Sequence, residues 1–220
     1  EEVLYPAMEE HVLDIIVGKG PSAKTLRLNL PPFTLVGATT KLSQLSAPLR
    51  DRFGALFRLS FYTEEEMQEI VKRSAKLLKV TIDTEAITAI AARSRQTPRI
   101  ANRILKRVRD YADMHDKKTV TKEECEQALL LLEIDEKGLD ATDRKILDTI
   151  ITKYNGGPVG LNTIAAAVAE EMATIEEIYE PFLLQLGFIE RTPRGRCVTA
   201  TGYEHLNHKA PTKVKQSLNL

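Results

Sequence analysis

The stretch APLRDRFG, residues 47–54, places two arginines around an aspartate and ends in Phe-Gly. Arginines in such a setting usually bind a carboxylate or a phosphate, because the planar guanidinium group matches the oxygens of either anion. The alternative is a surface ion-pair cluster that contributes little to stability and carries no function. The chain contains no G-x-x-x-x-G-K-[ST] loop that would hold a phosphate. If Arg52 binds a phosphate, we expect that phosphate to belong to another site.

The residues on either side of this stretch predict strands. Residues 12–36 alternate apolar and polar around Gly18-Lys19-Gly20-Pro21, which indicates a β-hairpin. The apolar run at 32–37 predicts a strand buried inside a parallel sheet, and residues 56–59 predict a second short strand. Thr39 and Thr40 would then end a strand at the sheet edge where ligands bind, unless one of them only caps a loop. Residues 1–8 resemble the middle of an amphipathic helix, so we expect further chain upstream.

The residues after Tyr62 change to a helical period. Capping boxes at Thr63 and Thr121, a capping Asp83 and the Thr97-Pro98 pair predict the starts of four helices, and hence a small all-α domain. Arg99 lies in the first turn of the third helix, where the helix dipole favours anions. A bound phosphate would compensate for this unfavourable position.

The C-terminal part has the plan of a winged helix. Residues 133–138 read as a linker, and three helices are predicted at 141–154, 161–170 and 174–186, the last capped by Thr174 with Glu177. A β-hairpin follows at 188–199 and carries Arg191, Arg194 and Arg196. The third helix carries Glu176, Glu177 and Glu180, which we expect phosphates to repel, so base reading in the major groove is disfavoured. Arginines of the hairpin would instead grip the phosphate backbone without sequence preference, unless they merely solubilise its tip.

Composition excludes little. The chain has 31 basic and 31 acidic residues, so its net charge predicts no partner. Its two cysteines, Cys125 and Cys197, lie far apart and its four histidines form no cluster, which predicts a reduced protein without a metal site. No apolar run is long enough to span a membrane and no signal peptide is visible. These observations predict a cytoplasmic protein.

Four motifs in order resemble one family. The sequences GATT (37–40), LRDRFG (49–54), TPRIANR (97–103) and RTPRGR (191–196) are together similar to RuvB, the AAA+ motor ATPase of bacterial Holliday-junction branch migration. The resemblance implies a mixed fold: the C-terminal part of an AAA+ α/β core at 1–62, a four-helix lid at 63–136, a winged helix at 137–206 and a flexible tail at 207–220.

The resemblance also implies functional residues. Thr40, or Thr39, would polarise the attacking water near the γ-phosphate of ATP. Arg52 would be the arginine finger that acts on the nucleotide of a neighbouring subunit in a hexameric ring, with Arg50 assisting. The remaining implied roles are nucleotide contacts by Tyr62 and Arg99, DNA contacts by Arg191, Arg196 and the tip residue Arg194, and docking of the partner RuvA by the hairpin from about Leu13 to Leu28.

One departure from the family pattern limits the expected activity. The phosphate-binding loop and the carboxylates that hold Mg²⁺ do not occur in this sequence. We therefore expect the 220-residue chain alone neither to bind ATP tightly nor to hydrolyse it. Two alternatives remain open: a winged-helix regulator without enzymatic activity, and an AAA+ replication initiator or clamp-loader subunit.

Overall fold

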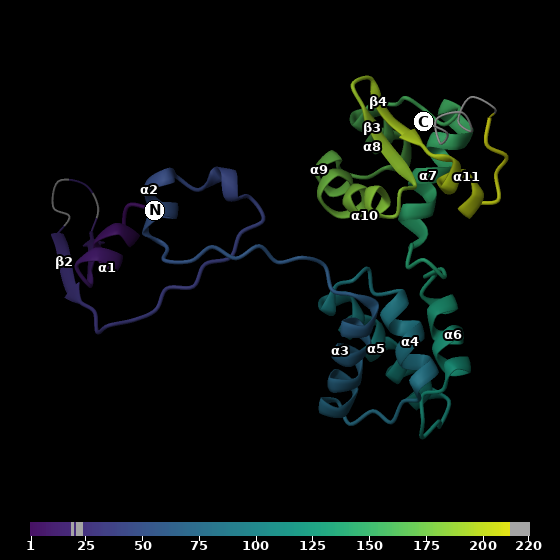
Figure 1. Ribbon diagram of the computed structural model, residues 1–220, viewed down its shortest axis with the longest axis horizontal. Coiled ribbons are helices and arrows are strands. Elements are labelled where there is room, and N and C mark those ends of the chain that lie inside the picture. The colour runs from purple at the N-terminus through teal and green to yellow at the C-terminus, as the bar shows by residue number, and fades with distance from the viewer. Residues whose placement is uncertain (19, 21–23, 212–220) are drawn as a thin grey trace. The chain divides into compact units, whose positions relative to one another are not determined.

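The computed structural model describes residues 1–18, 20 and 24–211, and the chain divides into two compact units, Glu1–Ser60 and Phe61–Leu220 (Figure 1). Two predictions fall partly outside the described residues. The turn of the first hairpin includes Lys19 and Pro21, and the predicted flexible tail includes residues 212–220.

The first unit contains the predicted hairpin. After helix α1 (Leu4–Glu9), strand β1 (Val12–Val17) pairs antiparallel with β2 (Lys24–Asn29), and Leu13 lies opposite Leu28. A short 3₁₀ turn, η2 (Leu42–Gln44), leads to helix α2 (Ala47–Arg52). Helix α2 begins where the Ser46 hydroxyl accepts a hydrogen bond from the Leu49 amide, as an N-cap serine should.

Two predicted strands are absent from the first unit. The segments 32–37 and 56–59 form no strand, and most of their apolar side chains are exposed, including Val36 by 85% and Leu59 by 95%. A strand is held by hydrogen bonds to a neighbouring strand, and within the described residues of this unit β1 and β2 pair only with each other. The prediction of a sheet interior at these segments is therefore wrong for this chain.

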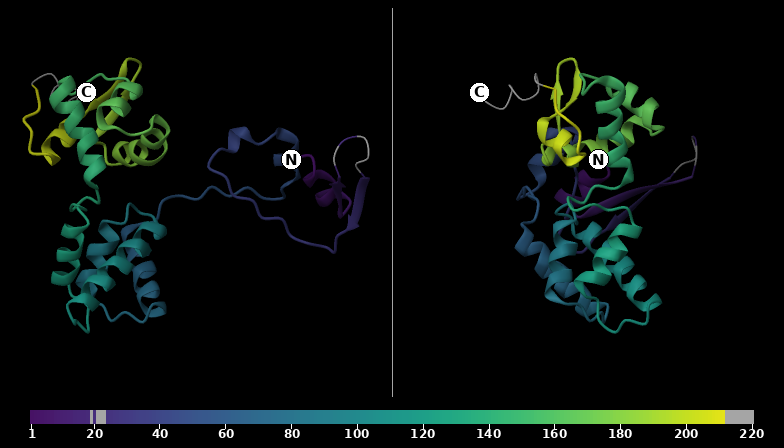
Figure 2. Two further views of the ribbon diagram at one scale, coloured as in Figure 1. Left: turned by 180° about the vertical axis from the view of Figure 1, so that it is seen from behind. Right: turned by 90° about the vertical axis from the view of Figure 1, so that its right-hand side faces the viewer.

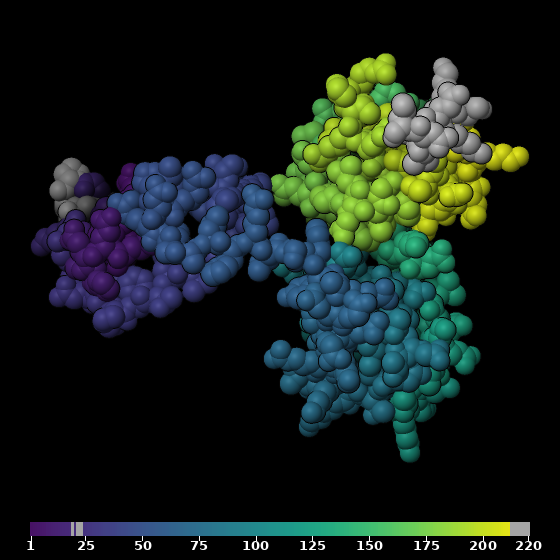
Figure 3. Space-filling model, in the orientation of Figure 1, coloured from purple at the N-terminus to yellow at the C-terminus, as the bar shows by residue number. Residues whose placement is uncertain are grey.

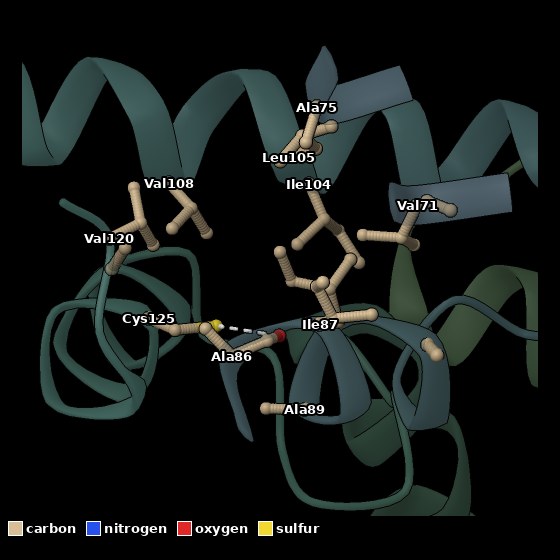
Figure 4. Packing of buried hydrophobic residues seen from close by; sticks show 14 of the residues in the cluster. Val71, Ala75, Ala86, Ile87, Ala89, Ile104, Leu105, Val108, Val120 and Cys125 are labelled. Carbon is tan, nitrogen blue, oxygen red and sulfur yellow. Dashed lines mark hydrogen bonds between the residues drawn. The ribbon is translucent and has the colours of Figure 1, made fainter. Parts of the chain in front are cut away.

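The second unit begins with the predicted helical bundle, made of α3 (Glu64–Leu77), α4 (Thr84–Ala92), α5 (Pro98–Met114) and α6 (Lys122–Leu131). Both predicted capping boxes, at Thr63 and Thr121, are present, and the Asp83 carboxylate accepts a hydrogen bond from the Ala86 amide at 2.6 Å. The four helices enclose one apolar core, part of which is drawn in Figure 4. Within this core Cys125 lies beside the Ala86 carbonyl, and burial raises the pKa of its thiol to about 12.

The winged helix follows as a second core. Its helices are α7 (Ala141–Tyr154) and α8 (Leu161–Val168), then α9 (Met172–Thr174), the π-helical segment η3 (Ile175–Tyr179) and α10 (Glu180–Gln185) in succession. The wing is the antiparallel pair β3 (Ile189–Thr192) and β4 (Gly195–Val198), extended by a bridge from Val159 to Arg196. A short helix that the sequence did not predict, α11 (Ala200–His205), packs Tyr203 into this core. The tip of the wing projects from its domain in all three ribbon views (Figures 1 and 2).

The predicted start of the third winged-helix helix is wrong. Thr174 has helical backbone angles, and the residue with N-cap geometry is Glu171. The helical path runs on through the wider π turn to Pro181, whose missing N–H group and ring disfavour regular α-helical bonding to the preceding turn. The wide turn therefore sits directly before Glu180.

Candidate functional site

Arg52 is held within its own unit. Its Nε donates to Glu9 Oε1 at 2.7 Å and its Nη1 donates to the Pro48 carbonyl at 2.8 Å, while its guanidinium lies 4.6 Å from the centre of the Tyr5 ring. Arg50 and Arg52 both occupy the last turn of α2, where a cation is favoured by the helix dipole. The side chain of Arg52 is 30% exposed, so it is positioned but still accessible to an anion.

The GATT stretch lies beside the end of α2. A Cβ atom placed on Gly37 would lie 3.5 Å from the Phe53 ring, which shows that the two predicted motifs are neighbours in the first unit. The Thr39 hydroxyl accepts a hydrogen bond from the Lys41 amide at 2.9 Å and so stabilises a local turn. Thr40 is exposed. Of the two threonines, Thr39 therefore fits the loop-capping alternative and Thr40 is the better candidate for polarising water.

Tyr62 and Arg99 belong to the second unit. Both are exposed, and Arg99 occupies the first turn of α5, as predicted. This helix start has no acidic residue in its first turn, and the Thr97 hydroxyl donates to the Arg95 carbonyl instead of capping the helix. The amide groups at the start of α5 therefore have no side-chain cap, which leaves them suited to an anion.

The wing arginines converge on one buried carboxylate. Arg191 and Arg196 lie directly opposite each other in the β3–β4 register, and both reach Glu180. From Arg191, Nε and Nη2 donate to the two carboxylate oxygens at 2.8 Å each. From Arg196 the corresponding distances are 2.8 and 3.2 Å. The Glu180 side chain is 1% exposed, whereas those of Arg191 and Arg196 are 51% and 20% exposed.

The electrostatics of this cluster correct one prediction. Burial alone would raise the pKa of Glu180, but the hydrogen bonds from Arg191 and Arg196 outweigh it and lower that pKa. Glu180 is therefore an ionised and enclosed partner of the two arginines. The sequence had predicted a surface charge that repels phosphates, and for Glu180 this prediction is wrong. The sequence contained one indication of this role. Arg191 and Arg196 flank the predicted turn, and two like charges that face each other across a hairpin destabilise the hairpin unless an opposite charge lies beside them.

Backbone geometry fixes the wing below its tip. Gly195 has φ +139°, and a Cβ atom there would lie 2.5 Å from the Val159 carbonyl oxygen. The Thr192 hydroxyl donates to the Gly195 carbonyl at 2.8 Å across the turn. Arg194 lies exposed in this turn, and the yellow-green wing stands out from the surface of its domain in the space-filling view (Figure 3). Within the part of the chain that the structure describes, Arg194 thus lies exposed at the tip of the wing, and Arg191 and Arg196 share the single carboxylate of Glu180 at its base.

A second ionic cluster, which the sequence did not predict, joins the bundle to the winged helix. Arg95, in the loop between α4 and α5, donates from Nε to the Gly138 carbonyl at 3.0 Å and pairs through Nη2 with Asp140 at 3.2 Å and with Asp143. Its guanidinium also lies 4.6 Å from the centre of the Phe182 ring. Burial raises the pKa of the fully enclosed Asp143 to about 7, although the charge of Arg95 opposes the rise.

A cavity of about 180 Å³ lies beside this junction. Its lining includes Arg93, Arg95, Arg103 and Arg107. Arg93 and Arg95 are engaged by carboxylates, since Arg93 also pairs with Glu126 at 2.8 Å. Among residues 1–18, 20 and 24–211, no group of three or more His, Cys, Asp or Glu side chains could hold a metal ion, and no helix is long and apolar enough to cross a membrane.

Three family models match the chain in succession. They describe the Holliday junction DNA helicase RuvB P-loop domain at residues 1–59, the RuvB AAA lid domain at 62–135 and the RuvB C-terminal winged helix domain at 136–207. The first of these matches covers only part of a P-loop domain, since the phosphate-binding loop itself does not occur in the sequence.

Individual relatives agree with these matches. The Holliday junction branch migration complex subunit RuvB of Dehalococcoides mccartyi (strain CBDB1) is 59% identical over 207 residues, which cover 94% of this chain and 59% of the relative. The solved Thermotoga maritima RuvB Holliday junction branch migration motor is 47% identical, with a TM-score of 0.77 over 96% of this chain and 65% of that one. A mutant of the same protein, at 48% identity and a TM-score of 0.78, covers 96% of this chain and 66% of its own.

The chain therefore spans about three fifths of the length of the first relative and about two thirds of the solved structures. The mixed fold predicted from the sequence, with part of an AAA+ core, a helical lid and a winged helix, is confirmed. This chain belongs to the RuvB family.

Proposed function

We propose that this chain is the DNA-gripping and nucleotide-sensing part of a Holliday-junction branch migration motor that works in the bacterial cytoplasm. The observation that carries the proposal is the wing, an exposed hairpin with Arg194 at its tip and Arg191 and Arg196 at its base. Contacts from such a hairpin go to phosphates and carry no sequence preference. A motor that moves along any duplex needs this kind of grip. The proposed DNA contacts are therefore Arg191, Arg194 and Arg196.

The nucleotide contacts are distributed over both units. In the intact protein, Arg99 and the uncapped start of α5 fit the phosphates of ATP, and Tyr62 contacts the same nucleotide. Arg52, with Arg50 assisting, stabilises charge on the nucleotide of a neighbouring subunit, and Thr40 orients water. ATP bound with Mg²⁺ supplies the phosphoryl group that is hydrolysed. Because the phosphate-binding loop is absent, the chain by itself is proposed to be inactive and to bind no nucleotide tightly.

Two protein partners complete the proposal. Action of Arg52 on an adjoining nucleotide requires a closed ring of subunits, for which we propose six. The partner RuvA docks on the hairpin of β1 and β2. Apolar side chains of this hairpin are exposed to solvent, including Ile16 by 72% and Leu26 by 51%, as expected of a docking surface.

The DNA contact is tested by titrating the chain with labelled duplexes of unrelated sequence over a range of salt concentrations. Arg194→Ala should weaken binding to all sequences equally and reduce the salt slope by about one unit. Arg107→Ala, on the exposed face of α5, is the matched control and should leave the slope unchanged. Unequal effects on different duplexes would contradict a backbone grip.

A further inference from the structure

The charge balance of the wing raises a question that the proposed DNA contact does not answer. Arg191 and Arg196 face each other across the hairpin, and like charges in this position repel. Glu180 offsets the repulsion, but it also cancels one of the two positive charges that DNA would meet. A DNA-binding wing thus keeps a buried acid at its base, at the expense of net attraction.

The hydrogen-bond pattern suggests what the acid provides. Each guanidinium uses Nε and Nη2 to hold Glu180. The Nη1 groups are not part of these forks. Because a fork of two bonds fixes the plane of a guanidinium, Glu180 sets the direction in which both Nη1 groups point. Arginine side chains otherwise lose considerable rotamer freedom when they bind a ligand.

Glu180 is itself fixed in place. It lies between the π-helical turn of η3 and Pro181, and its side chain is 1% exposed, so it has little freedom to move away when DNA arrives. Arg191, in contrast, is half exposed. We propose that Glu180 is a positioning residue, which orients Arg191 and Arg196 in advance so that their free edges bind DNA phosphates.

This inference rests on the proposed DNA contact of the wing. Its test is the affinity for duplex DNA after the charge of Glu180 is removed: charge repulsion alone predicts tighter binding, and positioning predicts weaker binding. Glu180→Gln keeps the shape of the side chain but removes its charge. If the carboxylate only repelled DNA, this variant would bind a duplex more tightly. Positioning predicts that binding weakens by between about twofold and tenfold for each arginine that must then be ordered on binding.

The matched control is Glu190→Gln. Glu190 precedes Arg191 on the same strand and is exposed, so the change removes an equal charge without touching the buried fork. This control should bind DNA as tightly as the unaltered chain or more tightly. Weaker binding by Glu180→Gln together with unchanged or tighter binding by Glu190→Gln supports positioning. Tighter binding by both variants would overturn it.

The Arg191 and Arg196 variants distinguish a failure of the proposed DNA contact from a failure of the positioning role. If Arg191→Ala and Arg196→Ala bind duplex as well as the unaltered chain, these two arginines do not hold DNA and the role of Glu180 falls with them. If these two variants weaken binding while Glu180→Gln does not, the wing contact stands and only the positioning role is lost.

A measurement on the unaltered chain covers the case in which Glu180→Gln unfolds the winged helix. The Nε protons of Arg191 and Arg196 should be protected from solvent exchange in nuclear magnetic resonance spectra of the free chain. This protection should persist when duplex is added to saturation, because the forks stay in place. Loss of protection on binding would show that DNA displaces Glu180, and would overturn the proposal.

Discussion

At the scale of single residues, Arg52, the proposed arginine finger, is fixed by contacts within its own unit. It is held by Glu9 and by the Pro48 carbonyl, beside the Tyr5 ring. These contacts hold the guanidinium in one place beside α2, yet an exposed ion pair of this kind contributes little to stability. A phosphate could therefore replace Glu9 at small cost.

This arrangement gives a prediction for the intact motor. Arg52→Ala should retain ATP binding and lose turnover by about 10³-fold or more, because an arginine finger acts mainly in the transition state. Arg58→Ala, an exposed arginine of the same unit, is the control and should retain turnover. Mixing Arg52→Ala subunits with subunits that lack only the phosphate-binding loop should restore part of the activity. No restoration in the mixture would argue against action between subunits.

Gly195 gives a second prediction at this scale. Gly195→Ala should destabilise the winged helix by about 1–3 kcal/mol, because the new Cβ meets the Val159 carbonyl at 2.5 Å and the backbone has positive φ. Gly187→Ala is the matched control: its φ is also positive, at +68°, but nothing lies within 4 Å of the new atom. Urea unfolding should show the larger loss for Gly195→Ala. Equal losses would mean that the contact with Val159 is unimportant.

At the scale of elements, the sequence was sufficient where the determinants of structure are local. The capping box of α3 and the proline at the start of α5 involve residues at most three apart, and each predicted helix begins there. The segments 32–37 and 56–59 failed as strands because a strand depends on a neighbour that sequence pattern alone does not supply. Thr174 failed as a cap because the π turn and Pro181 changed the course of that helix.

The same distinction separates the candidate sites. Arg191 and Arg196 were found from their spacing around a Pro-Gly turn, which is local. The role of Glu180 was not predicted, because it depends on the packing of a helix against the hairpin. Glu180 lies 11 residues before the nearer arginine, Arg191, in the sequence. The contacts of Arg95 with Asp140 and Asp143 span more than forty residues of sequence, and no motif predicted them.

The start of α6 gives a prediction about pH. Hydrogen bonds from Thr121 and then from Lys117 lower the pKa of Glu124 from 4.5 to about 2. A carboxyl group with a lowered pKa stabilises the fold above its ordinary pKa, and this contribution is lost as the pH falls from 4.5 through 2. Glu124→Gln should therefore unfold at lower urea than the unaltered chain at pH 7, and the difference should shrink by pH 3. A difference that stays constant with pH would contradict ionic capping.

At the scale of the whole second unit, the bundle and the winged helix are joined by few but specific contacts. The Arg95 cluster is the most enclosed, and nearby Gln185 donates from Nε2 to Gln96 Oε1 at 2.6 Å. On the other side of the linker, His205 stacks on Phe188 and contacts Asp135 at 2.9 Å. Because Arg95 lies four residues before Arg99, the loop that leads into the proposed nucleotide-sensing helix is also the loop that contacts the winged helix.

Removal of the Arg95 side chain should therefore allow the bundle and the winged helix to unfold independently. Arg95→Ala leaves the buried Asp143 without its guanidinium, and breaking a buried pair in this way costs about 3 kcal/mol or more. In hydrogen exchange followed through a urea series, the unaltered chain should lose protection in α5 and α7 together, whereas the variant should lose it in α7 first. Arg109→Ala, whose partner Asp110 is its neighbour on the same helix, should behave as the unaltered chain does. If α5 and α7 of Arg95→Ala still unfold at one urea concentration, other contacts across the linker, such as that of His205 with Asp135, carry the energetic coupling between the two domains.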